Sequence, residues 1–273
     1  MRANVDSFVH GSRRLDLTGI DFSAFLARPL EEDALRCIRY MHDVEHHTIC
    51  YLRDLLLTSA HRDPETTAFL TMWNAEEYWH GIALGEVLAA HGEVSNRDRV
   101  LPMRRRLRWR DNLTPLAHIL GSAIAGERFA AIHMSWGAIN EWTTQGAYAQ
   151  LAARADHPVL TELLARIMKQ EGRHIDFYAS AAQQRLECSS VARGLTRAVL
   201  KTLWRPVGAN VMPGEELLHL TRYLFTDSPG MAAAQRIDRQ VDRLPGLKGL
   251  ALLENAVQRV RMSETGAPIG EIT

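Results

Sequence analysis

The sequence LTMWNAEEYWHGIALGEV at residues 70–87 has the period of an α-helix. Residues three and four positions apart lie on one face of a helix, and in a bundle that face is apolar and contacts other helices. Here the inward face carries Leu70, Trp73, Glu77, His80, Leu84 and Val87. A carboxylate and an imidazole in the middle of this face predict a buried polar site.

Working outward from this helix, Ala, Leu, Arg and Glu dominate long stretches between Pro and Gly, and alternating strand patterns are nearly absent. We predict an all-α fold in which four long helices form a bundle, followed by shorter C-terminal helices. The long helices are expected at 30–59, 64–91, 114–154 and 158–187. The shorter ones are expected at 189–204, 214–225 and 246–262, and residues 92–113 are expected to form a linker.

This pattern predicts a single domain over residues 30–262, preceded by an N-terminal arm at 1–29 and followed by a flexible tail at 263–273. The composition fits a globular chain, with 46% hydrophobic and 23% charged residues. Lys+Arg and Asp+Glu balance at 32 each, so no global charge favours nucleic acid. The absence of an apolar run long enough for a membrane span, and of a secretory signal, predicts a cytoplasmic protein. Three scattered cysteines are too few for a disulfide framework and are expected to be reduced.

The other three long helices also carry carboxylates on their inward faces, at Glu45, Glu141 and Glu171. Burying a carboxylate costs several kcal/mol unless a cation or hydrogen-bond donors compensate it. None of the inward faces contains Lys or Arg. A metal ion is therefore the expected compensation, and a buried polar network is the alternative.

Sequence spacing brings these carboxylates together in pairs. Glu45 precedes His61, at the turn of the first hairpin, by as many positions as Glu77 follows it. Glu141 and Glu171 are likewise equally far in sequence from Asp156, at the turn of the second hairpin. Since both helices of a hairpin rise about 1.5 Å per residue, each pair lies at one height.

Glu127 lies on the same predicted face, but it is about twice as far in sequence from the second turn as Glu141 is. This places it roughly 21 Å from the level of Glu171, so we do not expect it to be a ligand. On the same helix, small residues such as Gly121, Ala125, Gly126 and Gly137 leave room for an apolar channel or for close helix packing.

Three Glu-x-x-His pairs occur, at residues 77–80, 171–174 and 216–219. The first two place carboxylate and imidazole one turn apart on an inward face, whereas the third is expected to be a surface pair. One Glu from each of two helices and Glu-x-x-His from each of the other two form the ligand set of a di-iron or di-manganese bundle. The predicted ligands are Glu45, Glu77, His80, Glu141, Glu171 and His174.

The segments Ala75–Gly81 and Gln170–His174 resemble the two ligand motifs of the soluble acyl-[acyl carrier protein] desaturases, which belong to the ferritin-like superfamily. The segment Asn140–Thr144 resembles that family's third-helix motif, in which a Thr three residues after a ligand Glu lies near the oxygen-binding face. The similarity covers about residues 30–262. Gln170 is a departure, because the family has an acidic residue at that position.

The resemblance implies a ferritin-like bundle that holds two iron ions, with manganese able to occupy the same ligands, and a catalytic role for Thr144. It also implies desaturation of an acyl chain carried as an acyl carrier protein thioester, a ferredoxin-type electron donor and a homodimer. The basic cluster Met103–Arg110 is interpreted either as a docking site for an acidic carrier or as a loop that forms intramolecular ion pairs.

Related sites also carry out hydroxylation or N-oxygenation of small natural-product intermediates, which is the alternative function. Iron storage is disfavoured, because a long C-terminal segment follows the fourth long helix and storage ferritins need only the four-helix core. Whether a histidine near Glu45 is an additional metal ligand stays open. His42 lies nearest the inward face, and His46 and His47 lie further from it. Tyr78 lies off the inward face, which argues against a role in radical storage.

Overall fold

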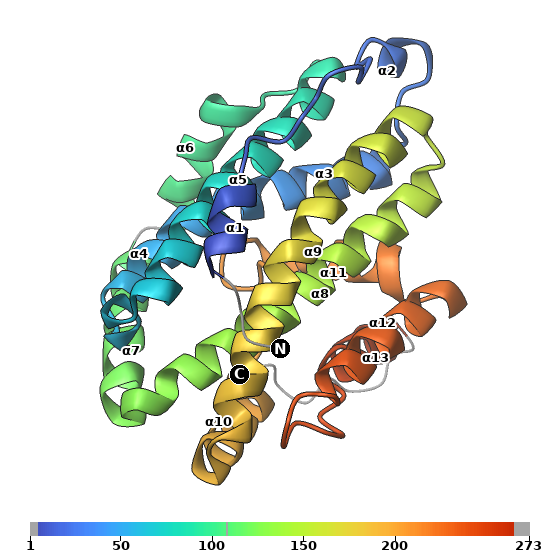
Figure 1. The fold of residues 1–273 in the computed structure, drawn as a ribbon. Coiled ribbons are helices and arrows are strands. Elements are labelled where there is room, and N and C mark those ends of the chain that lie inside the picture. The colour runs from blue at the N-terminus through green and yellow to red at the C-terminus, as the bar shows by residue number, and fades with distance from the viewer. Residues whose placement is uncertain (1–4, 108, 265–273) are drawn as a thin grey trace.

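The computed structural model describes residues 5–107 and 109–264 of the chain, and within these ranges the protein is all-α, without a strand. The core of the fold consists of α3 (Glu32–Glu45), α4 (Thr48–Leu56), α5 (Pro64–Ala90), α8 (Phe129–Ala155) and α9 (Pro158–Glu187). Figure 1 shows α5, α8 and α9 as the longest helices, with α3 behind them. The predicted helical bundle is confirmed.

The turns of the two hairpins lie where the sequence predicts. The Asp63 carboxylate accepts from the backbone N–H groups of Glu65 and Thr66, and Pro64 follows it, so α5 starts there. Asp156 adopts the left-handed conformation with φ of 45° and ends α8, and α9 starts at Pro158. These turns place the middles of α5, α8 and α9 within the core.

The single helix predicted over 30–59 is wrong, because the chain breaks into α3 and α4 just after Glu45. The His47 N–H donates to the Val44 carbonyl at 2.9 Å, a tighter i to i−3 bond than the α-helix uses. The Thr48 hydroxyl donates to the Glu45 carbonyl at 2.7 Å and satisfies it. The helix therefore turns immediately after its ligand residue, and the short η1 (Ser59–Arg62) completes the connection to α5.

The predicted linker at 92–113 is also wrong, since it forms α6 (Asn96–Leu107) and the start of α7 (Trp109–Ala125). Val100, Met103 and Leu107 follow helical spacing and are buried in a small apolar cluster of their own. The continuous helix predicted over 114–154 is interrupted by η2 (Gly126–Arg128), where Gly126 has a φ of 58°. Only glycine adopts this backbone conformation readily, so the helix ends there and α8 begins at Phe129.

The C-terminal segment forms α10 (Ser190–Leu203) and α11 (Gly214–Phe225) as predicted, then α12 (Ser228–Val241) and α13 (Leu252–Glu264). No helix was expected at α12, although Asp227 caps it by accepting from the Gly230 N–H. The last helix starts at Leu252 rather than at 246, because Gly246 and Gly249 have positive φ values and form a turn. Both α12 and α13 pack beside the bundle (Figure 1).

The N-terminal arm is more ordered than the sequence indicates and contains α1 (Val5–Gly11) and α2 (Ala24–Ala27). Phe8 and Leu15 from this arm are buried in the main core.

The tail predicted at 263–273 lies, from residue 265 onward, outside the described residues. None of the helices that the structure describes is long and apolar enough to cross a membrane. No disulfide joins the cysteines within the described ranges; Cys37 is buried and Cys188 is exposed.

Candidate metal centre

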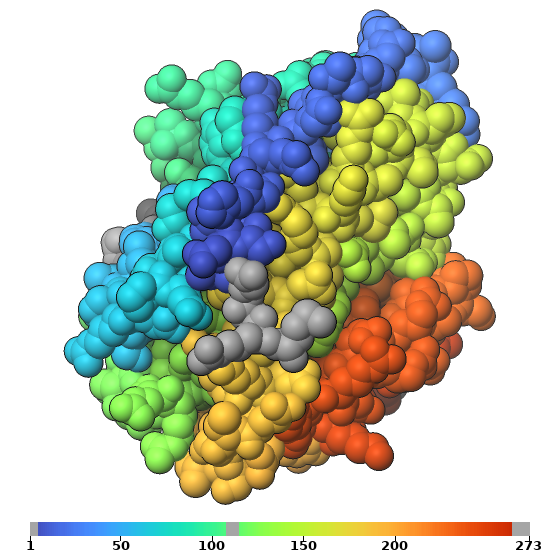
Figure 2. All heavy atoms as spheres, in the orientation of Figure 1, coloured from blue at the N-terminus to red at the C-terminus, as the bar shows by residue number. Residues whose placement is uncertain are grey.

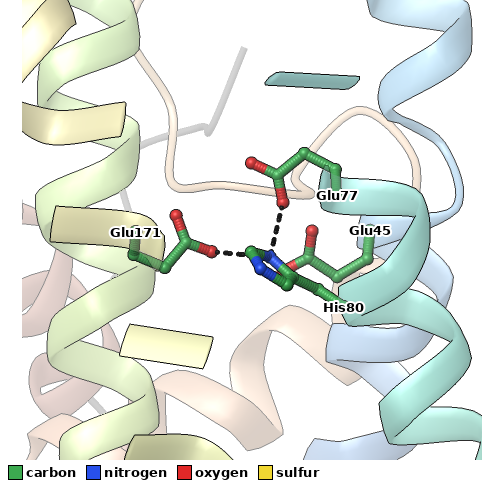
Figure 3. Close-up of side chains that lie close together, drawn as sticks. All are labelled: Glu45, Glu77, His80 and Glu171. Atoms are coloured by element: carbon green, nitrogen blue, oxygen red, sulfur yellow. Dashed lines mark hydrogen bonds and ion pairs between the residues drawn. The ribbon is translucent and has the colours of Figure 1, made fainter. Parts of the chain in front are cut away.

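The six predicted ligands meet in the middle of the bundle and are all buried. They form two groups, each of which offers four ligand atoms within 4.8 Å of one another and could hold a metal ion. One group consists of Glu45, Glu77, His80 and Glu171, which Figure 3 shows converging from α3, α5 and α9. The other consists of Glu77, Glu141, Glu171 and His174.

Glu77 and Glu171 belong to both groups, and their individual oxygens are divided between the two histidines. The Nδ1 atom of His80 lies 3.1 Å from Glu77 Oε2 and 3.2 Å from Glu171 Oε1. The Nδ1 atom of His174 lies 3.2 Å from Glu77 Oε1 and 3.0 Å from Glu171 Oε2. Each of these carboxylates thus presents one oxygen to each half of the site, which is the geometry of a carboxylate that bridges two cations.

The buried charges in the site need compensation, by protons or by a metal ion. Burial, together with the charges of Glu77 and Glu171, raises the pKa of Glu45 and Glu141 well above the ordinary value. Burial lowers the pKa of His80, but its hydrogen bonds to Glu171 and Glu77 outweigh this and raise the pKa to about 10. Without a metal, protons on these side chains must compensate the charges. Since metal ligands bind in their deprotonated forms, a bound metal would replace those protons.

Polar groups around the ligands fix their orientation. The Nε2 atom of His174 lies 2.8 Å from the Glu76 carboxylate, and the Nε2 atom of His80 lies 2.9 Å from Gln170 Oε1. Because these outer acceptors take the Nε2–H group, the Nδ1 lone pairs remain available to a metal. The amide oxygen of Gln170 thus fixes the outer nitrogen of the His80 ring.

Glu45 and Glu141, which each belong to only one of the two groups, also accept hydrogen bonds from side chains outside the groups. The Trp73 indole N–H donates to Glu141 Oε1 at 2.9 Å, and the Tyr148 hydroxyl donates to Glu45 Oε1. Sequence reasoning placed Trp73 on the inward face and singled out Gln170, but it did not identify Glu76 or Tyr148 as partners of predicted ligands. Glu76 and Gln170 each directly precede a ligand Glu, which was the available signal.

Thr144 lies at the edge of a narrow cavity beside the Glu45 half of the site. The cavity has a volume of about 50 Å³ and is lined mainly by apolar side chains of α3, α8 and α11, including Met41, Leu220 and Phe225. Glu45 and Tyr148 also line it. Among the six predicted ligands, Glu45 thus borders this apolar space.

Several other candidates lie away from the site. Glu127 is exposed in η2, as expected for a residue that is not a ligand. Glu216 forms an ion pair with Arg36 at 2.8 Å, so the third Glu-x-x-His pair has a structural role. Tyr78 is 50% exposed, which agrees with its predicted position off the inward face.

The histidines near Glu45 belong to neither group of metal-ligating atoms among the described residues. His42 was the nearest candidate, but both of its ring nitrogens are engaged. Nδ1 lies 3.0 Å from Asp43 Oδ1, and Nε2 accepts from the Asn96 N–H at 3.0 Å. His42 thus fastens α6 to α3, and His46 and His47 lie in the turn that follows Glu45.

The basic cluster Met103–Arg110 forms intramolecular contacts where the structure describes it. Arg104 donates to the His46 carbonyl at 2.8 Å, and Arg106 lies 3.9 Å from the Asp43 carboxylate. The side chains of Arg108 and Arg110 lie outside the described part of the chain.

No protein family model, curated protein or solved structure matches this chain.

Proposed function

We propose that the protein is an oxygen-activating di-iron oxidoreductase of the ferritin-like type that oxidises an apolar substrate. The division of the Glu77 and Glu171 oxygens between His80 and His174 carries this proposal, because it provides two adjoining ligand groups with two shared carboxylates. Carboxylate and imidazole ligands suit iron and manganese. When bound, two iron ions would supply electrons to dioxygen and oxidising power toward a substrate C–H bond.

The favoured substrate is an acyl chain carried as an acyl carrier protein thioester, with electrons supplied by a ferredoxin-type donor. This part of the proposal rests on the resemblance of residues 75–81, 140–144 and 170–174 to the soluble acyl-[acyl carrier protein] desaturases. The apolar lining of the cavity beside Glu45 supports an apolar substrate group. In this proposal the Thr144 hydroxyl donates a proton or a hydrogen bond at the open side of the site.

A related oxygenase, acting as a hydroxylase or N-oxygenase on a small molecule, is the second candidate. The cavity volume of about 50 Å³ favours it, because ligand pockets usually measure roughly 300–1,000 Å³. A long acyl chain would require the side chains of α3 and α11 around the cavity to move. A small substrate would require less displacement.

An oxygen-reaction experiment tests the proposed function. The protein is loaded anaerobically with Fe(II) and then exposed to dioxygen while its optical spectrum is recorded. We expect an oxygen-dependent change in absorption that is absent from Glu77→Ala and retained by Glu127→Ala. An unchanged spectrum in the native protein would refute oxygen activation.

Product analysis then separates the two candidates. An acyl carrier protein thioester that accelerates the reaction and gains a double bond would support desaturation. Acceleration by small amines or aromatic compounds, with oxygen incorporated into the product, would support the second candidate. We expect Thr144→Val to slow turnover while the iron content stays unchanged.

A further inference from the structure

The N-terminal arm reaches the residues that orient both ligand histidines. The backbone N–H of Arg13 donates to Glu76 Oε1 at 3.1 Å, and the backbone carbonyl of Arg13 accepts from Gln170 Nε2 at 3.1 Å. Glu76 holds His174 and Gln170 holds His80. One peptide segment therefore contacts the outer partners of both halves of the site.

The hydrogen bond to Arg13 determines which end of the Gln170 amide faces His80. An amide has a donor end and an acceptor end, so when Nε2 donates to the Arg13 carbonyl, Oε1 points to His80 Nε2. The acceptor Oε1 in turn requires the hydrogen of His80 on Nε2. A His80 ring that gave up its Nδ1 proton to bind a metal would then hold its lone pair on Nδ1, on the side of the carboxylates.

Glu76 is fixed on the opposite half in a similar way. Its Oε1 atom accepts from the Arg13 N–H and from Arg173, and its Oε2 atom faces His174 Nε2. The Arg13 N–H and Arg173 therefore hold the Glu76 carboxylate in place as an acceptor for the His174 ring.

The arm is anchored on both sides of Arg13. Phe8 and Leu15 are buried at 6% and 4% exposure, and the Phe8 ring lies 5.9 Å from the His174 ring. Arg166 donates to the carbonyls of Asp16 and Thr18 at 2.8 and 2.9 Å. Figure 2 shows this blue segment lying on the surface over α5 and α9. Figure 1 shows α1 crossing the same two helices.

We infer that residues 5–18 form a strap over the histidine side of the metal centre, and that the main chain of Arg13 is a positioning element for both ligand histidines. The inference rests on the proposed metal centre. The side chain of Arg13 is not required, because both bonds come from the backbone.

A proline substitution tests this inference, because proline has no N–H and so removes the donor to Glu76. We expect Arg13→Pro to weaken metal binding about tenfold or more, as is typical when outer partners of ligands are lost. Arg13→Ala keeps both backbone bonds and is the matched control, expected to bind like the native protein. Equal metal affinity of Arg13→Pro and Arg13→Ala in a chelator competition would overturn the inference.

A metal-free measurement separates this inference from the proposed function. In the protein without metal, imidazole ¹⁵N spectra report the hydrogen bonds that Nε2 of His80 and Nε2 of His174 make to Gln170 and Glu76. We expect Arg13→Pro, but not Arg13→Ala, to change the Nε2 signal of His174, because its partner Glu76 loses a donor. This change would support the strap even if the native protein bound no iron, and unchanged signals would refute it.

A second variant remains informative if Arg13→Pro fails to fold. Gln170→Glu keeps an acceptor for His80, but its carboxylate cannot donate to the Arg13 carbonyl. We expect faster amide hydrogen exchange across residues 5–18 in Gln170→Glu than in the native protein. Equal exchange would show that the amide does not hold the strap.

Discussion

Gly137 tests whether the core beside the metal centre is closely packed or leaves room for a channel. A Cβ atom added at this position would lie well below the 3.4 Å of ordinary contact from the ring carbons of Tyr178. The Tyr178 ring is fully buried and cannot move aside easily, since Phe69 packs on it at 4.7 Å and His133 at 5.8 Å between ring centroids. Gly137→Ala is therefore expected to overpack the interface of α8 and α9.

The expected magnitude follows from two opposing effects. Overpacking a core typically costs about 1–3 kcal/mol. Replacing a glycine inside a helix by alanine gains about 0.5–1 kcal/mol, because the unfolded chain loses conformational freedom. We therefore expect Gly137→Ala to lower the free energy of unfolding by about 1 kcal/mol, which is the difference between the middles of these two ranges.

Gly194 in α10 is the matched control, because nothing lies within 4 Å of a Cβ added there. Gly194→Ala is expected to raise the free energy of unfolding by about 0.5–1 kcal/mol. Urea unfolding of the metal-free proteins, compared at equal m-values, measures both changes. The reasoning is refuted if Gly137→Ala is as stable as the native protein or more stable.

Three further variants test other parts of the structure. Asp63→Ala should lower the free energy of unfolding by about 1 kcal/mol in urea unfolding at pH 7, since α5 loses its cap. Burial raises the pKa of Asp63, but its hydrogen bonds and a nearby arginine outweigh it, so the pKa lies below 3.8. The difference from the native protein should thus persist above pH 3.8 and vanish as the pH falls through the lower, folded-state pKa. Trp73→Phe removes the donor to Glu141 and should weaken metal binding by about tenfold in chelator competition, with native-like stability. Arg99→Ala removes the bidentate hydrogen-bond partner of the fully buried Asp43. It should lower the free energy of unfolding by about 2 kcal/mol, measured by thermal or urea unfolding.

The meeting of the six predicted ligands could be foreseen because two simple rules of helix geometry place them. Helical spacing placed Glu77 and His80 on one face, and equal distances from the hairpin turn placed Glu45 level with Glu77. The structure bears out this placement, since these residues form one of the two groups. The same logic excluded Glu127, which is exposed in η2.

The features that the sequence did not predict depend on contacts distant in the chain or on small backbone changes. The turn after Glu45 depends on a tightened hydrogen bond at His47, in a segment whose sequence keeps the spacing of a helix. The bonds from Arg13 to Glu76 and Gln170 span 63 and 157 residues, so no local pattern indicates them. The helix α12 was missed although Asp227 and Pro229 form a recognisable start signal.

Iron stoichiometry tests the dinuclear centre most directly. The native protein and the variants Glu45→Ala, Glu77→Ala and Glu127→Ala are titrated with Fe(II) under anaerobic conditions, and bound metal is counted per chain. Because Glu45 belongs to one of the two groups and Glu77 to both, we predict two irons in the native protein and in Glu127→Ala, one in Glu45→Ala and none in Glu77→Ala. A native protein that binds no iron, or a Glu77→Ala variant that binds as much as the native protein, would contradict the account.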